Sequence, residues 1–340
     1  MRRSVKLSLV CLALLISTLA ACAPPATPVA PLPPNPSPTD LVAPVATLPP
    51  TSTPRPTYHS MPLPTPSIPE TLFDVDEHKM NLECYGIGSP TVVIEQHLYS
   101  GLRDRGWDGV IPNIAAETRI CTYDRLNAGA SDSIGSYTFE QAAGEWHDLM
   151  QAAKLSPPYI VVGSEFGGFF ALSEANRYPA EVAGIVLIDS AHLPAPEKWL
   201  AVLPTPSPAE SGTLKDLRER RSMGVLPKER WDQIEKQEGI DLVGVGRQQI
   251  QAITALSKVP LIVLVAAAGR NEYGQNWPGI SPAVTAKLDE VWIGLQKDYL
   301  ALSSDSQLVI ADHSGPYVQV DQPELVVSAI FNVLDKVRQK

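Results

Sequence analysis

The sequence predicts an α/β domain whose mostly parallel sheet is covered on both faces, because two features of the chain agree. From about residue 71 onward, short apolar runs of strand length alternate with segments of helical spacing. The runs are continuously apolar, which is typical of parallel strands buried on both faces. Strands that are separated by helices in this way are expected to be joined by helical crossovers over the sheet.

The expected strands begin with a hairpin over residues 72–75 and 80–84. Further strands are expected at 91–95, 118–123, 159–162, 182–188, 259–265 and 308–310. Helical spacing predicts helices over 139–153, from Gly163 to about 178, and over 323–337, where a proline starts the helix without losing a hydrogen bond. Residues 192–258 are charged and helical, interrupt the alternation, and are expected to form a lid over one end of the sheet.

The composition excludes several classes of function. The chain has 27 Lys and Arg against 37 Asp and Glu, a net charge of −10, and no basic patch that would favour nucleic acid. No apolar run reaches the roughly 20 residues that a spanning helix needs. No cluster of His and Cys predicts a metal site, and no glycine-rich loop predicts a phosphate cradle. We therefore expect no metal, no cofactor and no nucleic-acid partner.

Residues 1–21 are expected to be a signal peptide. A basic start precedes an apolar stretch over 7–19, which is too short to span a bilayer. The stretch ends in Leu19-Ala-Ala-Cys22, which resembles the lipobox of bacterial lipoproteins. The resemblance implies that Cys22 is lipidated and that membrane lipid anchors the protein at an extracytoplasmic surface. An ordinary secretory signal with a chance cysteine is the alternative.

Residues 22–70 are expected to be the lipidated cysteine followed by a disordered tether. The segment after Cys22 contains 17 of the 33 prolines, which are too frequent for a helix and leave too little apolar bulk for a core. We expect the tether to act as a spacer between the membrane and a folded domain over 71–340.

Two cysteines remain in that domain once Cys11 has left with the signal and Cys22 has become the anchor. They are Cys84 and Cys121. An exported chain reaches a compartment that permits disulfides, so this pair is a candidate bridge. Two buried free thiols are the alternative.

A resemblance to a known family enters at a strand–turn–helix junction. The run Tyr159-Ile-Val-Val-Gly163-Ser-Glu-Phe-Gly167-Gly168 resembles the nucleophile elbow of α/β hydrolases, usually G-H-S-x-G-G. Other segments follow the family in order and spacing. The segment G-I-G-S-P-T-V-V-I-E at 86–95 resembles the strand entering the oxyanion loop, and C-T-Y-D-R with G-A-S-D at 121–132 resembles Y-D-R-x-G-x-G-x-S. After the elbow come R-Y-P at 177–179 and V-L-I-D-S at 186–190, as the family expects. The end of the chain, S-G-P-Y-V at 314–318 before D-Q-P-E-L-V at 321–326, resembles S-G-H-x-I…D-Q-P-E-L-V.

The resemblance covers about residues 71–340 and implies the α/β-hydrolase fold with a helical lid over about 192–258. It implies that the strands carrying Cys84 and Cys121 are neighbours, which favours the disulfide. It also implies an oxyanion region at Gln96, His97 and Phe166.

The two most diagnostic catalytic positions depart from the family. Alignment on the glycine pair puts Glu165 where the nucleophilic serine belongs, and Pro316 where the histidine belongs. A serine hydrolase needs a hydroxyl on the turn and an imidazole that takes its proton. A shift of one residue would make Ser164 the nucleophile, but the glycines would then be out of place. The sequence therefore predicts a catalytically degenerate surface lipoprotein that binds a small molecule or a surface protein.

A working hydrolase of esters, amides or C–X bonds is the alternative function. Glu165 would then act as the nucleophile, as Asp does in some members of the family, although its extra methylene alters the attack geometry. It would need a base, and His313, His97 and His192 are the candidates. Each of these histidines is also interpreted as a loop residue without chemistry.

The acid of the triad has two candidate positions, Asp189 after the strand at 182–188 and Glu272 after the strand at 259–265. Asp189 is alternatively a strand-end residue that caps local amides. The charge of Glu165 is expected to sit where backbone N–H groups and the following helix N-terminus favour an anion, so that the pocket is satisfied by its own side chain. A third interpretation is a tethered module whose lid helices, at 214–222 and 230–237, bind a partner.

Overall fold

The computed structural model describes residues 58, 60–98, 100–102, 104–193, 195–215, 218, 238–242, 244–256, 258–266 and 280–340. The predicted signal peptide, Cys22, most of the tether and Glu272 lie outside the described residues, as do most of the two predicted lid helices. Within the described part of the chain, no helix is both long and apolar enough to cross a bilayer.

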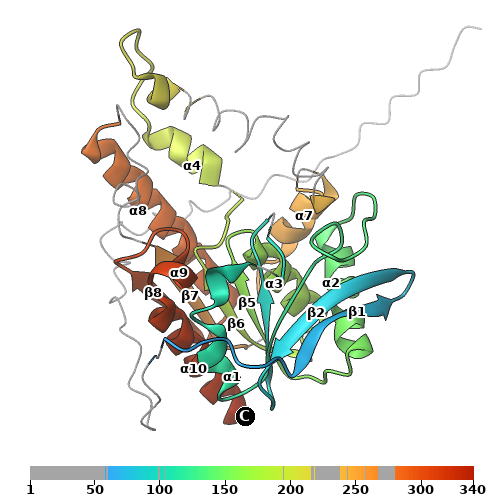
Figure 1. The fold of residues 1–340 in the computed structure, drawn as a ribbon. Helices are drawn as coiled ribbons and strands as arrows, with labels where there is room; N and C mark the ends of the chain where they lie inside the picture. The colour runs from blue at the N-terminus through green and yellow to red at the C-terminus, as the bar shows by residue number, and fades with distance from the viewer. Residues whose placement is uncertain are drawn as a thin grey trace, which may run out of the picture. The chain divides into compact units, whose positions relative to one another are not determined.

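Eight strands form one sheet in the order β1-β2-β4-β3-β5-β6-β7-β8 (Figure 1). They are β1 (Ile68–Val75), β2 (His78–Tyr85), β3 (Thr91–Glu95), β4 (Ile120–Tyr123), β5 (Tyr159–Ser164), β6 (Val182–Ile188), β7 (Leu261–Ala266) and β8 (Ser306–Ala311). The pairs β1–β2 and β2–β4 are antiparallel, and every other pair is parallel. The predicted mostly parallel sheet is therefore confirmed.

Helices cover both faces of this sheet. On one face lie α2 (Phe139–Ala152), α3 (Gly167–Arg177) and α8 (Pro282–Asp298), and on the other lie α1 (Ile111–Ala115) and α10 (Pro323–Arg338) (Figure 1). Alternate residues of the central strands supply the two cores, as Val161 and Ile160 of β5 show. The remaining short helices are η2 (Arg105–Trp107), α4 (Ala195–Val202), α7 (Val245–Ala252), η3 (Tyr299–Leu302) and α9 (Val318–Asp321).

The hairpin and the strand of β8 are longer than the sequence predicts. β1 begins at Ile68, and a two-residue turn at Asp76 and Glu77 connects it to β2. Asp76 adopts a φ of 48°, a left-handed conformation that Asp tolerates better than most residues. Helix α8 was not predicted, although Ser281 caps it through its side chain and a proline occupies its first turn.

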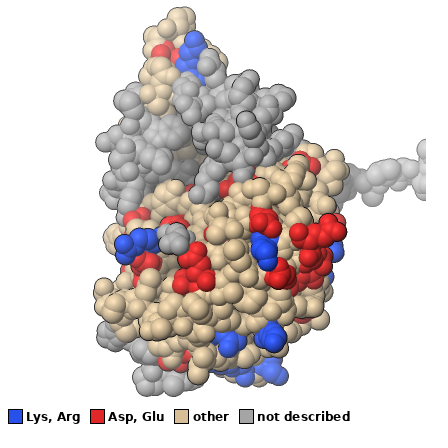
Figure 2. Space-filling view, turned by 45° about the vertical axis from the view of Figure 1, so that its right-hand side comes forward, with Lys and Arg blue, Asp and Glu red and all other residues tan. Residues whose placement is uncertain are grey.

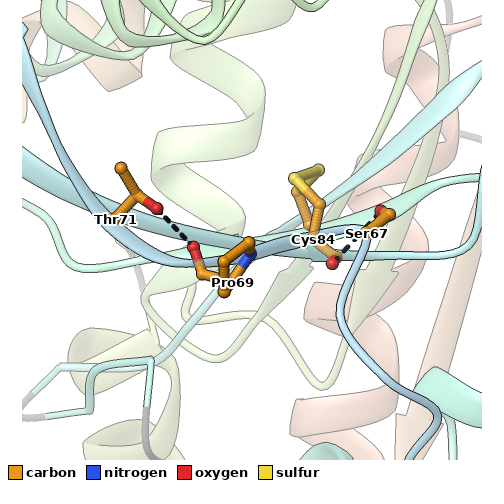
Figure 3. The surroundings of a disulfide bond; sticks show 5 residues. Ser67, Pro69, Thr71 and Cys84 are labelled. Atoms are coloured by element: carbon orange, nitrogen blue, oxygen red, sulfur yellow. Dashed lines mark hydrogen bonds between the residues drawn. A yellow bond between two sulfur atoms is a disulfide. The ribbon is translucent and has the colours of Figure 1, made fainter.

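Cys84 and Cys121 form a disulfide between β2 and β4. The two cysteines are directly opposite each other in the antiparallel pair and are fully buried. Ser67, just before β1, donates its hydroxyl to the Cys84 carbonyl at 3.3 Å, and Thr71 donates its hydroxyl to the carbonyl of Pro69 (Figure 3). The bridge thus lies under the start of the chain's first strand.

This disulfide is expected to contribute measurably to stability because it closes a loop with a sequence separation of 37. Replacing both cysteines by alanine should lower the free energy of unfolding by about 2–4 kcal/mol. Urea denaturation of the wild type and of the double variant, both under non-reducing conditions, measures the difference. A loss below about 1 kcal/mol would contradict a structural role for the bridge.

Candidate functional site

The elbow between β5 and α3 carries Glu165 at its tip. Glu165 has a φ of 48°, its N–H donates to the Ile188 carbonyl at 3.0 Å, and its carbonyl accepts from the N–H groups of Gly168 and Ala191. Ser164 is the last residue of β5 and is fully buried, and its Oγ has no hydrogen-bond partner among the described residues. The register that places Glu165, and not Ser164, in the nucleophile's position therefore agrees with the backbone geometry.

Pro316 lies in the loop between β8 and α9, where it supplies neither a proton acceptor nor a donor. Its neighbour Tyr317 is 44% exposed, and the negative charge of Glu165, followed by burial, raises the pKa of the Tyr317 hydroxyl. The fold therefore brings the Pro316 loop close to Glu165, as the resemblance implies, but without an imidazole.

His97 is the imidazole that the structure brings closest to this chemistry. Its Nδ1 lies 2.7 Å from the Leu98 carbonyl, and its Nε2 lies 3.3 Å from Oδ2 of Asp104. Burial lowers the pKa of His97. The hydrogen bonds to Asp104 and Leu98 and the charge of Glu165 raise it by a larger amount, so the net shift is upward. The same hydrogen bond from His97 holds the pKa of Asp104 well below its usual range.

The contacts of His97 decide its protonation state. A carbonyl and a carboxylate only accept hydrogen bonds, so the doubly protonated ring satisfies both contacts. An imidazolium has no lone pair with which to activate a nucleophile or a water molecule. These contacts and the upward shift of its pKa favour the imidazolium form of His97, held between Asp104 and the charge of Glu165, over the neutral ring that a base requires.

The other two candidate histidines are in different surroundings. His313 has a side chain that is 81% exposed and lies 3.9 Å from Oδ1 of Asp312. The His192 ring packs against Tyr299, and its Nε2 lies 4.0 Å from Oδ2 of Asp298. Burial lowers the pKa of His192 to about 4, so its ring is neutral at pH 7. These contacts connect His192 to α8 and η3.

Asp189 is engaged structurally at the end of β6. Its Oδ1 accepts from Trp292 Nε1 at 2.6 Å and from the Ala266 N–H at 3.2 Å, and the residue is 3% exposed. These bonds tie β6 to α8 and to the end of β7. They support the interpretation of Asp189 as a strand-end residue that satisfies its neighbours.

The predicted oxyanion region is held together by a residue that the sequence did not single out. Arg125 donates to the carbonyls of Gln96 at 2.9 Å and His97 at 3.1 Å, and its guanidinium lies over the Phe170 ring at 4.4 Å. The Gln96 side chain donates to Thr122 and accepts from Ser100, both at 2.6 Å. Phe166 starts α3, and its ring packs edge-on against Phe169. The Y-D-R segment was the available signal for Arg125.

A cavity of about 910 Å³ opens beside His97. Four carboxylates contribute to its lining, those of Glu70, Asp104, Asp124 and Glu238. Ser100 and Asn127 also line it. Asp124 is buried and accepts from the N–H groups of Leu102 and Ala130. Among the described residues, no group of three or more His, Cys, Asp and Glu is arranged to hold a metal ion.

Comparison with known proteins agrees with this architecture. Residues 89–220 match the family model of the alpha/beta hydrolase fold. A solved structure of a thermophilic esterase from Thermogutta terrifontis superposes with a TM-score of 0.50 at 21% identity, covering 79% of this chain and 99% of that one. The protein has the α/β-hydrolase fold. Its predicted fold class and its resemblance to this fold family are confirmed.

Two of the sequence relatives of this α/β-hydrolase-fold protein are uncharacterized proteins. An uncharacterized protein of Schizosaccharomyces pombe is 26% identical over 261 residues, and the match covers 62% of this chain and 48% of the yeast protein. The uncharacterized protein YqjL of Bacillus subtilis is 23% identical over 247 residues, covering 72% of this chain and 85% of YqjL. The chain therefore spans about half of the yeast protein's length.

Proposed function

We propose that this α/β-hydrolase-fold protein is a catalytically degenerate surface lipoprotein that binds a ligand in the cavity beside His97. The observation that carries the proposal is the contact set of His97, whose two ring nitrogens both face acceptors. With Pro316 in the family's histidine position, this leaves the elbow carboxylate of Glu165 beside a cation in place of a base. The described lining of the cavity includes His97 and four carboxylates but neither Glu165 nor Pro316. Such a cavity can bind and orient a molecule, and an imidazolium at His97 does not activate a nucleophile.

The charge of the cavity lining favours a small cationic ligand. Its four carboxylates face one imidazolium, His97, in the described lining. Arg125, behind the wall, balances part of the charge of Glu238, since their side chains lie 3.4 Å apart. Asp124 accepts hydrogen bonds from three neutral N–H groups among the described residues, and its carboxylate would attract an organic amine and repel an anion.

Lipidation of Cys22 would anchor the domain to an extracytoplasmic membrane surface, with the chain from residue 23 to the start of β1 at Ile68 as the tether. The basic start, the apolar stretch and the small residues before Cys22 support this part of the proposal. The Cys84–Cys121 disulfide is consistent with an oxidising compartment.

The test is a turnover assay on the full chain purified in mild detergent. Short-chain p-nitrophenyl esters and haloalkanes are offered to the wild type and to a Glu165→Ala variant, with thermal unfolding as the check that both are folded. We expect no turnover above buffer in either. Turnover that disappears in Glu165→Ala would establish the alternative, a hydrolase of esters, amides or C–X bonds that depends on Glu165.

The binding arm of the same test uses spermidine as the cationic probe and citrate as the anionic control. A ligand that binds only the folded state raises the unfolding temperature in proportion to its concentration over its Kd. We expect a rise with spermidine at low salt, a smaller rise at high salt, and none with citrate. An equal effect of both probes would contradict a cation-selective cavity.

A further inference from the structure

Four charged side chains meet in the interior behind the cavity wall. Glu95 ends β3, Glu174 lies in α3, Arg125 follows β4, and Glu238 belongs to the inserted segment. All four are nine-tenths or more buried, Glu95 and Glu174 almost completely. Three carboxyls thus share one guanidinium, with Glu238 at the cavity wall and Glu95 and Glu174 buried behind it.

Glu95 and Glu174 are neighbours, and their surroundings call for a proton between them. Both oxygens of Glu95 and Oε2 of Glu174 are buried, and the side chains that interact with Glu95 by hydrogen bonding are the Tyr123 hydroxyl and the Glu174 carboxyl. A buried carboxylate without a donor is costly, whereas a proton on the pair supplies the missing donor. Burial, opposed in part by the charge of Arg125, raises the pKa of Glu95 to about 7, and burial together with Glu95 raises the pKa of Glu174 well above its usual range.

The charge of Glu95 therefore changes near neutral pH while its neighbours keep theirs. Tyr123 from β4 and Tyr137 before α2 also face the cluster, and burial raises the pKa of both hydroxyls well above the usual range. Both tyrosines stay neutral and the Glu174 carboxyl stays protonated, so the charges that meet Glu95 are those of Arg125 and Glu238.

Glu95 and Glu238 compete for Arg125. Nη2 of Arg125 lies 3.4 Å from Oε2 of Glu238, and Nη1 lies 3.9 Å from Oε2 of Glu95. The same guanidinium already donates to the Gln96 and His97 carbonyls, so it has little freedom to follow one carboxylate without weakening its contact with the other.

Glu238 begins a short segment, 238–242, that forms part of the cavity wall. Asn127 donates its side-chain amide to the Glu238 carbonyl at 3.2 Å, the Tyr137 N–H donates to the Gly239 carbonyl at 2.7 Å, and the Asp241 N–H donates to the Tyr137 carbonyl at 2.9 Å. These three bonds, the ion pair with Arg125 and the buried side chains of Ile240 and Leu242 hold the segment against the core.

We propose that Glu95, Arg125 and Glu238 form a pH-sensitive latch on segment 238–242. While Glu95 is protonated, Arg125 forms its ion pair with Glu238, and the segment stays on the cavity wall. When Glu95 releases its proton to solvent, its carboxylate takes a share of the guanidinium, and the segment opens more often. The latch rests on the buried cluster and not on ligand binding, so it stands or falls separately from the proposed function.

The direction of the pH effect follows from linkage. In the closed state Arg125 is shared with Glu238, so it stabilises the Glu95 carboxylate less than in the open state, where Glu238 reaches water. The closed state therefore has the higher Glu95 pKa, and its advantage is complete at low pH and is lost as the pH rises through that pKa.

Hydrogen–deuterium exchange of the full chain tests the latch. After correction for intrinsic rates, the protection of the Tyr137 and Asp241 amides should fall roughly tenfold between about pH 5.5 and about pH 8.5, as a difference of one pKa unit between closed and open states requires. Glu95→Gln should keep the high protection at every pH, and Glu238→Gln should show the low protection throughout.

Two further variants keep the test decisive. Glu174→Leu should move the fall in protection to higher pH, because the hydrogen bond from the Glu174 carboxyl that lowers the pKa of Glu95 is then lost. Glu324→Gln, at an exposed glutamate in the first turn of α10, is the matched control and should leave the pH dependence unchanged. A wild type whose protection does not vary with pH, or an unchanged pH dependence in Glu95→Gln, would overturn the latch.

Discussion

Arg125→Ala should lower the free energy of unfolding by about 3–5 kcal/mol, because removal of one partner leaves buried charges without compensation. Glu238 would lose its cation, and the carbonyls of Gln96 and His97 would lose their donor. Urea denaturation at neutral pH measures the loss. Arg105→Ala is the control, since the Arg105 side chain is 88% exposed and its ion pair with Asp108 should contribute less than about 1 kcal/mol.

Arg125→Lys separates charge from geometry in the same experiment. An ammonium keeps the positive charge, but it cannot donate in a planar fork to two carbonyls and a carboxylate at once. We therefore expect Arg125→Lys to recover only part of the stability that Arg125→Ala loses. If Arg125→Ala lowers the free energy of unfolding no more than Arg105→Ala does, Arg125 does not stabilise the loop that contains Gln96 and His97.

The cluster around Arg125 also shows where reasoning from sequence ends. The parallel sheet could be predicted because each buried strand is a local apolar run, as at 159–162 and 182–188. The elbow could be predicted because its glycines stand at fixed spacing. The meeting of Glu95, Glu174 and Glu238 depends on three elements that are far apart in the chain, and no local pattern records it.

The sequence indicates which catalytic side chains are replaced, but it does not indicate which contacts the remaining side chains make. Glu165 and Pro316 could be assigned by alignment with a motif, and they lie at the turn between β5 and α3 and in the loop between β8 and α9. The state of His97 could not be predicted, because it depends on Asp104 and on a carbonyl of the same loop. The signal for Asp104 in the sequence is one acid in a short loop, which is common on any surface.

Close backbone contact at the elbow gives the second large expected effect, a loss of about 3 kcal/mol or more for Gly167→Ala. A Cβ at Gly167 would lie 2.0 Å from the Glu95 carbonyl oxygen and 2.8 Å from that of Gln96. Both contacts are with backbone, so no side-chain rotation can relieve them, and either the start of α3 or the end of β3 must move. Thermal and urea unfolding measure the cost.

Gly294→Ala is the matched control because Gly294 lies inside α8, where an added Cβ meets nothing within 4 Å. Alanine loses less backbone entropy than glycine in a helix, so this variant should be more stable than the wild type by about 0.5–1 kcal/mol. The two substitutions add the same methyl group. Changes of opposite sign in the free energy of unfolding would show that packing requires the glycine at the elbow. Because that packing is independent of the residue at 165, it also explains how the elbow's backbone persists with Glu165 at the nucleophile's place. Equal effects of the two substitutions would contradict this account.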